Sequence, residues 1–318
     1  MHVRLEAVRP LRFVDGHPVR AASAIVRLGE GWLIVQDDAT HGCWWRDDLG
    51  TPVRLLPSVE DLDLFASQDG TKHLKPDLEA ACEVPGGAVL LGSGSTPARM
   101  RAVLVRLEDD VPSIKVVDLA PLYSGVRQTL GIAAEHLNLE GACIVGDALR
   151  WFQRGRPAGG FATASVDVDL ADLLEVLAGS RAADDVALTA VRRYDLGAAD
   201  GVGLSITDAV SLGAGRVLVS LAAEDAPNAY DDGPVVASAL ALLDDDREPD
   251  VVVLPPIRGA VAKVEGLAIL DWDDGGGRLL ATVDADDRAV PSALLTLDVS
   301  GVSSRGSRAW SCDPGSRP

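Results

Sequence analysis

The sequence predicts an all-β fold, a β-propeller of five four-stranded blades. Three observations indicate this: a short phrase recurs at nearly even spacing, three further short apolar runs come after most copies of it, and the amino terminus supplies the one run that the last copy lacks. Repeats of this length are typical of proteins built from one supersecondary unit per repeat. A closed ring of small antiparallel sheets is the architecture in which such units protect each other's edges.

The repeated phrase is a glutamate followed by Gly or Ala and then by apolar residues, and it occurs at Glu79, Glu140 and Glu265. The first step is 140 − 79 = 61 residues and the second is 265 − 140 = 125, about two steps of ~62 if a weaker copy lies between. Ser205 stands in such a copy, midway between, and Ser23 stands in another, 79 − 23 = 56 residues before Glu79. The phrase therefore occurs five times, with Glu in three copies and Ser in two.

The residues after each copy predict the rest of a blade. After Glu79 come three short apolar runs separated by Gly, Pro, Ser and Asp, at residues 88–94, 101–105 and 114–119. Together with the phrase they read as four strands. The last copy has only two such runs after it, and the amino-terminal residues 3–10 resemble the missing fourth run. We therefore expect the N-terminal strand to complete the last blade.

One long interval between copies leaves an alternative open. Residues 170–178 have apolar side chains at helical spacing and are followed by Gly179, which predicts a short helix inserted between strands. The alternative is a sixth blade hidden in this interval. We expect residues 1–300 to form a single propeller domain, and residues 301–318, rich in Ser, Arg, Gly and Pro, to be a partly disordered tail.

Composition and charge exclude several classes of partner. The formal net charge of −19 repels nucleic-acid backbones and acidic membrane surfaces, so neither is expected to bind. The N-terminus lacks a signal-peptide pattern and no run of 18 apolar residues occurs, which predicts a cytoplasmic protein that is a monomer or small oligomer. Cys82 and Cys143 stand at one repeat position and are expected to be small buried core residues.

The three repeated glutamates are the first candidate site. The first strand of each blade lines the central channel of a propeller, so Glu79, Glu140 and Glu265 are expected to face one another there. Like charges in such confinement require a cation, a shared proton or neighbouring basic groups, and a hard cation such as Ca²⁺ suits carboxylate oxygens. We expect these glutamates to be metal ligands. The alternative is that they accept hydrogen bonds from the backbone of the next blade and hold the blades together.

Two further sets of residues extend this site. Lys75 and His136 each stand four positions before a repeat glutamate, and with Glu140 they are the predicted catalytic, proton-transferring groups. The segments 37–41, 93–99, 153–156 and 224–232 occupy corresponding places after the phrase and are expected to form one rim of the ring. Arg99 and Arg154 from this rim, with Asp208, are the predicted substrate-binding residues, since guanidinium groups bind carboxylates and phosphates in pairs of hydrogen bonds.

The glutamate phrases, with residues 90–95 and with Arg99 and Arg101, resemble bacterial β-propeller proteins of unassigned function. More loosely, they are similar to phytase-like esterase and gluconolactonase (SMP-30-like) propellers. In the latter family a glutamate that opens an inner strand ligates a divalent metal in the channel. The resemblance implies this role for one of the three repeat glutamates, and with it a calcium-dependent, esterase-like or lactonase-like activity.

Two classes of function are compatible with the sequence. The first is a metal-assisted hydrolase or lactonase that acts on a small ester or anionic substrate at the propeller channel. The second is a non-catalytic binding or scaffold propeller with structural glutamates and a protein partner. Function depends on sites rather than on folds, so the architecture does not choose between the two.

Overall fold

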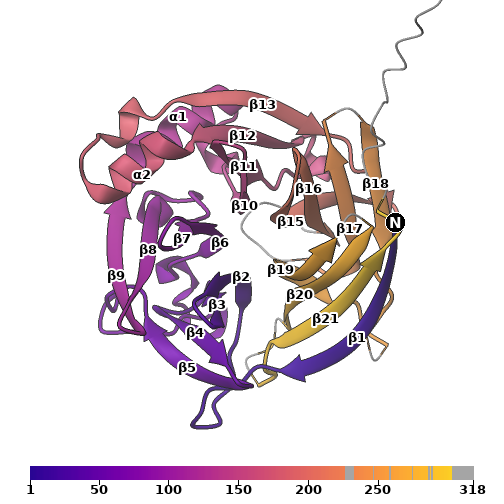
Figure 1. The fold of residues 1–318 in the computed structure, drawn as a ribbon, viewed down its shortest axis with the longest axis horizontal. Helices are drawn as coiled ribbons and strands as arrows, with labels where there is room; N and C mark the ends of the chain where they lie inside the picture. The colour runs from indigo at the N-terminus through magenta and orange to yellow at the C-terminus, as the bar shows by residue number, and fades with distance from the viewer. Residues whose placement is uncertain are drawn as a thin grey trace, which may run out of the picture.

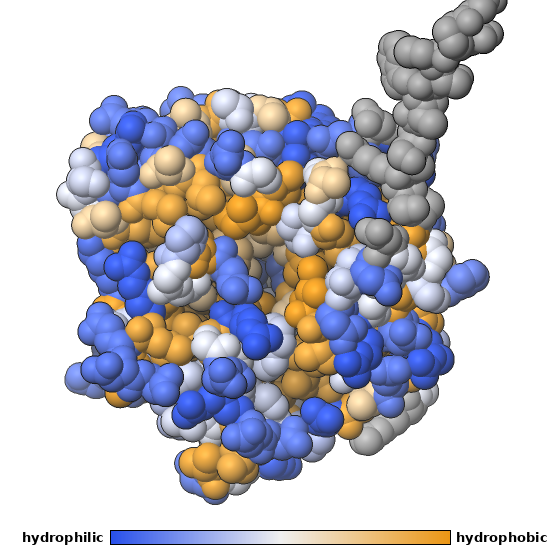
Figure 2. Space-filling view, in the orientation of Figure 1, coloured by the Kyte–Doolittle hydropathy of each residue, from blue (hydrophilic) through white to orange (hydrophobic). Residues whose placement is uncertain are grey.

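The protein is a ring of five antiparallel sheets around a central channel, a five-bladed β-propeller (Figure 1). The computed structural model describes residues 1–225, 233–245, 247–257, 259–273, 275–285, 287 and 289–302, and for residue 158 the main chain alone. The predicted fold class is therefore confirmed, including the number of blades. Figure 2 shows the same face of the ring in space-filling form, hollowed at its centre with hydrophilic side chains beside the hollow.

Blades 1 and 2 are regular four-stranded meanders, in which each strand pairs with the next in sequence. Blade 1 consists of β2 (Ala22–Leu28), β3 (Gly31–Gln36), β4 (His41–Arg46) and β5 (Leu49–Arg54). Blade 2 consists of β6 (Leu78–Val84), β7 (Gly87–Gly92), β8 (Arg101–Glu108) and β9 (Val111–Asp118). The first strand of each blade lies next to the channel and is almost wholly buried, because neighbouring blades cover both of its faces.

Blade 3 carries two helices on its outer side (Figure 1). Its strands are β10 (Leu139–Val145), β11 (Ala148–Gln153), β12 (Thr163–Asp169) and β13 (Leu188–Tyr194). Helix α2 (Leu170–Ala178) lies between β12 and β13 and ends at Gly179 in the left-handed conformation, which confirms the predicted inserted helix. Helix α1 (Ala120–Leu130) precedes the blade and was not predicted, although Leu122, Val126 and Leu130 stand at helical spacing and are buried.

The last two blades include the closure of the ring. Blade 4 consists of β15 (Val202–Gly213), β16 (Arg216–Glu224), β17 (Val235–Asp244) and β18 (Arg247–Val253), and the short β14 (Ala198–Ala199) pairs with the start of β15. Blade 5 consists of β19 (Lys263–Asp273), β20 (Gly276–Asp284), β21 (Ala293–Ser300) and β1 (His2–Pro10). Strand β1 pairs antiparallel with β21, which confirms that the N-terminal strand completes the last blade.

A bulge near the start of each inner strand fixes the register of the repeats. In β2, β6 and β19 the unpaired residue is Ser23, Glu79 and Glu265, and in β10 the break covers Glu140 and Gly141. In β15 the bulge falls at Thr207, two residues after Ser205. Thr207, and not Ser205 as the sequence pattern indicated, is therefore the structural equivalent of the repeat glutamates.

Side chains at or beside these bulges join neighbouring blades. The Ser23 hydroxyl donates to the carbonyl of Leu78 at 2.6 Å, and the Thr207 hydroxyl donates to that of Val264 at 2.7 Å. Both carbonyls belong to the residue that precedes the next repeat position. In the two copies that lack glutamate, serine and threonine therefore join neighbouring blades.

The small residue after each glutamate allows the inner strands to approach. A Cβ atom added at Gly141 would lie 2.8 Å from Asp208 Cα, and one added at Gly266 would lie 2.8 Å from Ala24 Cα. These distances are shorter than any ordinary van der Waals contact, so larger residues would force the blades apart. The Gly or Ala of the repeated phrase is thus a requirement of the narrow five-bladed channel.

The core consists of apolar layers between adjacent blades, and Cys82 and Cys143 are buried free thiols within it, as predicted. Of the expected disordered tail, Gly301 and Val302 are described, and Val302 packs in the core of blade 5, while 303–318 lie outside the described residues. Within the described ranges, no helix has both the length and the hydrophobicity needed to cross a membrane.

Candidate functional site

A cavity of about 550 Å³ opens at one end of the central channel, and all five blades contribute to its lining. Members of all four predicted rim segments line it, including Asp37, Ser95, Arg154 and Glu224; residues 226–232 of the last segment lie outside the described residues. Its charged lining comprises ten carboxylates and seven Lys or Arg side chains: Asp37, Asp38, Asp77, Glu79, Glu135, Glu140, Glu224, Glu265, Asp284, Asp287, Arg20, Lys72, Lys75, Arg99, Arg154, Arg156 and Lys263.

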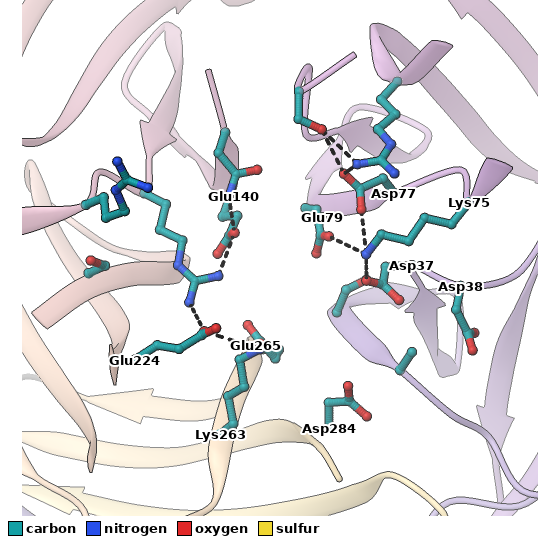
Figure 3. Close-up of a pocket in the computed structure, with 18 of the residues that line it drawn as sticks. Asp37, Asp38, Lys75, Asp77, Glu79, Glu140, Glu224, Lys263, Glu265 and Asp284 are labelled. Atoms are coloured by element: carbon teal, nitrogen blue, oxygen red, sulfur yellow. Dashed lines mark hydrogen bonds and ion pairs between the residues drawn. The ribbon is translucent and has the colours of Figure 1, made fainter. Parts of the chain in front are cut away.

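One wall of the cavity is a cluster of carboxylates around Lys75. Oxygen atoms of Asp37, Asp77 and Glu79 lie within 4.8 Å of one another. The Lys75 ammonium contacts Asp37, lies 2.7 Å from Asp77 Oδ1 and 4.0 Å from Glu79 Oε1 (Figure 3). Although burial opposes it, these charges hold the pKa of Lys75 well above its usual value. Lys75 is therefore a permanent cation at neutral pH.

Asp77 is the centre of this wall. Its backbone has φ 57°, in the left-handed region, which Asp tolerates better than most residues. The carboxylate is buried, accepts a hydrogen bond from Arg99 Nη1 at 2.8 Å and contacts the Ser93 hydroxyl. Lys75 and Arg99 hold the pKa of Asp77 below its usual range despite its burial, so Asp77 stays ionised.

The opposite wall is a second ionic network, formed by blades 3, 4 and 5. Arg154 donates to Glu140 Oε1 at 2.9 Å and to Glu224 Oε2 at 2.6 Å, so its guanidinium bridges two blades. Lys263 lies 2.8 Å from Glu265 Oε1 and 3.6 Å from Glu224 Oε2. Figure 3 shows this network and the Lys75 cluster facing each other across the cavity. These ion pairs therefore fall into two networks, one on each wall.

The three repeat glutamates occupy three different electrostatic environments. Burial, followed by repulsion from Asp77 and Asp37, raises the pKa of Glu79 well above its usual value. Burial also raises the pKa of Glu140 to about 7, although Arg154 opposes the shift. Glu265 is held in its ion pair with Lys263. The surroundings of Glu79 therefore favour its protonated form, while Glu140, with a pKa of about 7, exchanges readily between its two forms near neutral pH.

Glu140 combines this pKa with an unsatisfied oxygen. Its Oε1 accepts hydrogen bonds from Arg154 and from Asn138 Nδ2, the latter at 2.7 Å. Its Oε2 is buried and has no hydrogen-bond partner among the described residues. Buried polar atoms are satisfied in the great majority of cases, so such an exception at a cavity wall marks a position where a ligand or water can bind.

His136 is half-buried and lines the cavity. Its ring stacks on Phe161 with 3.8 Å between ring centroids, and its carbonyl accepts from Gln153 Nε2 at 2.8 Å. The carbonyl oxygen of the Gln153 side chain accepts from the Asn138 backbone at 3.0 Å. Gln153 thus fixes the segment that leads into β10 and, through it, the position of Glu140.

Asp208 lies deeper in the channel and is not part of the cavity lining. Only 1% of it is exposed, and Oδ2 accepts a hydrogen bond from the Leu267 backbone of blade 5 at 2.7 Å. Burial raises its pKa well above the usual value, although this hydrogen bond opposes the shift. Asp208 therefore joins blade 4 to blade 5, and it lies outside the cavity lining to which the other predicted site residues belong.

The structure brings most of the predicted site residues to one cavity. Lys75, Glu79, Arg99, His136, Glu140, Arg154 and Glu265 all line it. Glu140 and Glu265 are not members of the carboxylate cluster that includes Glu79, so the three predicted metal ligands are divided between the two walls. Arg99 and Arg154 reach the cavity but are engaged by carboxylates.

Sequence reasoning missed Asp77, which stands two positions before a repeat residue. Asp77, Lys263 and Ser205 stand at this position, as does Asn138, and all four line the cavity. With Thr207 as the true repeat residue of blade 4, Ser205 belongs to this set. The signal that could have found Asp77 is this recurring polar position, two residues before the repeat residue in four of the five copies.

Comparison with solved structures gives only weak similarities. A hypothetical protein from Leishmania major has 14% identity and a TM-score of 0.48, covering 93% of this chain and 91% of its own. A structure from the GH130 family of mannoside phosphorylases, which contains glycoside hydrolases that target β-1,2-mannosidic linkages in Candida mannan, has 8% identity and a TM-score of 0.45, covering 88% and 84%. TM-scores below 0.5 assign no activity to this chain.

A protein of unknown function from Dyadobacter fermentans has 14% identity and a TM-score of 0.39, covering 93% of this chain and 99% of its own. None of the curated proteins compared with the chain matches it significantly. One family model does match, that of the family of unknown function DUF6910, over residues 71–288. This match covers more than half of the chain, from the Lys75 cluster through Glu265 to the end of β20, and the protein therefore belongs to the DUF6910 family.

Proposed function

We propose that the protein hydrolyses a small ester or lactone at the channel mouth, with Glu140 as general base and Glu79 as general acid. The observation that carries this proposal is Glu140 itself, a buried carboxyl group with a pKa of about 7 and one unpartnered oxygen at the cavity wall. A general base is most effective when its pKa lies near the working pH. Two carboxyl groups with different pKa values supply an acid and a base together.

The proposed reaction uses the two glutamates on opposite sides of the scissile bond. Ionised Glu140 takes a proton from a water molecule, whose oxygen attacks the carbonyl carbon of the substrate. Protonated Glu79 donates its proton to the leaving oxygen as the acyl C–O bond breaks. The products are a carboxylic acid and a hydroxyl group, which remain in one molecule when the substrate is a lactone.

Neighbouring residues tune this pair. Arg154 and Asn138 hold Glu140 through Oε1 and leave Oε2 for water. Because Lys75 is a permanent cation, we assign it an electrostatic role beside Glu79 instead of the proton transfer expected from the sequence. His136 is placed at the cavity edge with Phe161, where it contacts the substrate rather than the reacting water.

A divalent cation such as Ca²⁺ is the second candidate, and a specific observation favours it. Asp37, Asp77 and Glu79 present oxygens within 4.8 Å, and Ca²⁺ binds six to eight oxygen ligands. Glu79 is the one predicted metal ligand in this group. The Lys75 ammonium contacts the same oxygens, so an ion bound there has to displace it. When bound, Ca²⁺ would polarise the substrate carbonyl.

The test is a hydrolysis panel of small esters and lactones, monitored by acid release, with the wild type, Glu140→Gln and Glu79→Gln. The matched control is Glu83→Gln, since Glu83 is an exposed residue of β6 outside the cavity. Loss of acid–base catalysis lowers kcat by about 10²- to 10⁴-fold, so Glu140→Gln should fall in that range. The proposal is refuted if Glu140→Gln is as active as the wild type, or if the wild type hydrolyses no substrate of the panel. Either result favours a binding protein.

The same panel separates the acid–base and metal candidates. With Glu140 as base, kcat/KM rises as the pH passes about 7, because only the ionised carboxylate accepts a proton. EDTA leaves this activity unchanged. Loss of activity in EDTA and its return with Ca²⁺ would instead assign the chemistry to the metal candidate.

A further inference from the structure

We propose that Arg156 binds a carboxylate of the substrate, so that the hydrolase takes a small ester or lactone bearing a separate carboxylate group. This inference rests on the proposed function and names its substrate class. Arg156 is half-buried and lines the cavity. Among the described residues its guanidinium has no carboxylate partner, whereas five other cations of the lining do: Arg20, Lys75, Arg99, Arg154 and Lys263.

The guanidinium of Arg156 is held in place before any ligand arrives. It lies over the Phe161 ring, 5.5 Å from the centroid, and the two residues form a backbone pair with N to O distances of 2.8 and 3.1 Å. A Cβ atom at Gly159 would lie 2.7 Å from Arg156 Nε, so the side chain packs closely along this turn. Preorganisation of this kind reduces the entropy lost when the ligand binds.

The same Phe161 ring contacts His136, so the cavity edge is a stacked unit of three residues: His136, Phe161 and Arg156. An arginine that has no carboxylate partner among the described residues can bind an oxyanion through two parallel N–H donors. Arg156 is half-buried whereas Glu140 is buried, so a substrate held by Arg156 has its anionic group apart from the carbonyl that reacts at Glu140.

The charge of the cavity favours a carboxylate over a phosphate. Ten carboxyl groups against seven Lys and Arg side chains leave a formal excess of 10 − 7 = 3 negative charges in the lining. With Glu79 in its protonated form and Glu140 either neutral or ionised, the excess is still one to two negative charges. A phosphate carrying two charges is repelled more strongly by this field than a carboxylate carrying one. We therefore assign a monoanionic carboxylate to Arg156.

The first experiment compares two matched substrates, a five-membered lactone bearing a carboxylate and the same lactone bearing a carboxamide. A charge-assisted hydrogen-bonded contact should favour the carboxylate in kcat/KM by about 10- to 100-fold in the wild type. In Arg156→Gln this ratio should fall toward one, and in Arg156→Lys it should be intermediate. Arg9→Gln is the control for net charge, because Arg9 is exposed and lies outside the cavity.

A ratio near one in the wild type, or an unchanged ratio in Arg156→Gln, overturns the inference while hydrolysis itself continues. If neither lactone is hydrolysed, the proposed function fails. A binding measurement then tests the role of Arg156 independently of hydrolysis. Calorimetry with succinamate, succinamide and inorganic phosphate should then show succinamate binding that Arg156→Gln weakens about 10-fold or more. Tighter binding of phosphate, or equal binding of succinamate by Arg156→Gln with an unchanged Tm, contradicts the carboxylate assignment.

Discussion

Glu140 and Arg154 lie 2.9 Å apart at the channel mouth, yet this contact engages only one of the two carboxyl oxygens of Glu140. Arg154 is itself shared with Glu224 of the next blade. A fully paired glutamate would be expected to have a lowered pKa, whereas burial raises that of Glu140 to about 7. Because the ion pair with Arg154 engages only one carboxyl oxygen, Glu140 can still exchange a proton near neutral pH.

Glu140→Gln should change how stability depends on pH. The folded-state pKa of about 7 lies above the ordinary glutamate value of 4.5, so its stabilising contribution is complete below about pH 4.5 and is lost as the pH rises through 7. At 1.36 kcal/mol per pKa unit, the variant should gain up to about 3 kcal/mol over the wild type at pH 8 and nothing at pH 4. Urea unfolding at both pH values, with Glu83→Gln as control, measures this, and parallel profiles would contradict it.

Asp208→Ala should destabilise the fold without removing a cavity residue. It deletes the acceptor of the Leu267 N–H and leaves a buried donor unpaired, which costs about 1–3 kcal/mol. Asp208→Asn retains a carbonyl oxygen and should lose less. Chemical unfolding of the two variants checks this, and equal losses would show that the hydrogen bond to Leu267 is not what stabilises the contact between blades 4 and 5.

Gly141→Ala and Gly146→Ala form a matched pair that tests the close approach of the blades. Both glycines have positive φ, 75° and 61°, so each alanine incurs about 1–2 kcal/mol of backbone strain. Only the Cβ at position 141 meets another strand, at Asp208 Cα. Overpacking should therefore cost Gly141→Ala a further ~1–3 kcal/mol, and equal melting temperatures for the two variants would show that the channel is not tightly closed.

Lys75→Ala should convert the Lys75 cluster into a cation site. Removal of the ammonium leaves Asp37, Asp77 and Glu79 without their shared partner and should destabilise the protein by about 3–5 kcal/mol in EDTA. Ca²⁺ should then raise the Tm of this variant, since an ion that binds only the folded state stabilises it. Lys263→Ala, which removes an ammonium from the other wall, is the control, and an equal response to Ca²⁺ in both would disprove a site in the cluster.

The fold was predictable because its signal repeats. Five copies of one phrase, together with N-terminal residues that match a missing strand, were enough to infer the blades and the closure of β1 on β21. The register of the fourth copy was not predictable from residue type, since Ser205 and Thr207 are chemically similar. It depends on where the bulge falls in β15, which the contact with Val264 in blade 5 determines.

The candidate site was predictable in its glutamates but not in their partners. Glu79, Glu140 and Glu265 occupy equivalent positions, and the sequence contains no reason for one to be protonated and another ion-paired. That difference arises because Glu79 is buried beside Asp77 and Asp37, whereas Glu265 is paired with the ammonium group of Lys263. Asp208 was misplaced because its burial results from the close approach of β10 to β15.

The most direct test of the proposed site is the titration of the Glu140 carboxyl group itself. Carbon-13 NMR of protein labelled at glutamate carboxyl carbons, with the Glu140 resonance assigned by its loss in Glu140→Gln, measures the pKa without any substrate. The geometry predicts a midpoint near 7, produced by burial against the pull of Arg154. A midpoint near 4.5, the value of an ordinary glutamate, would contradict it and leave the channel mouth without a general base.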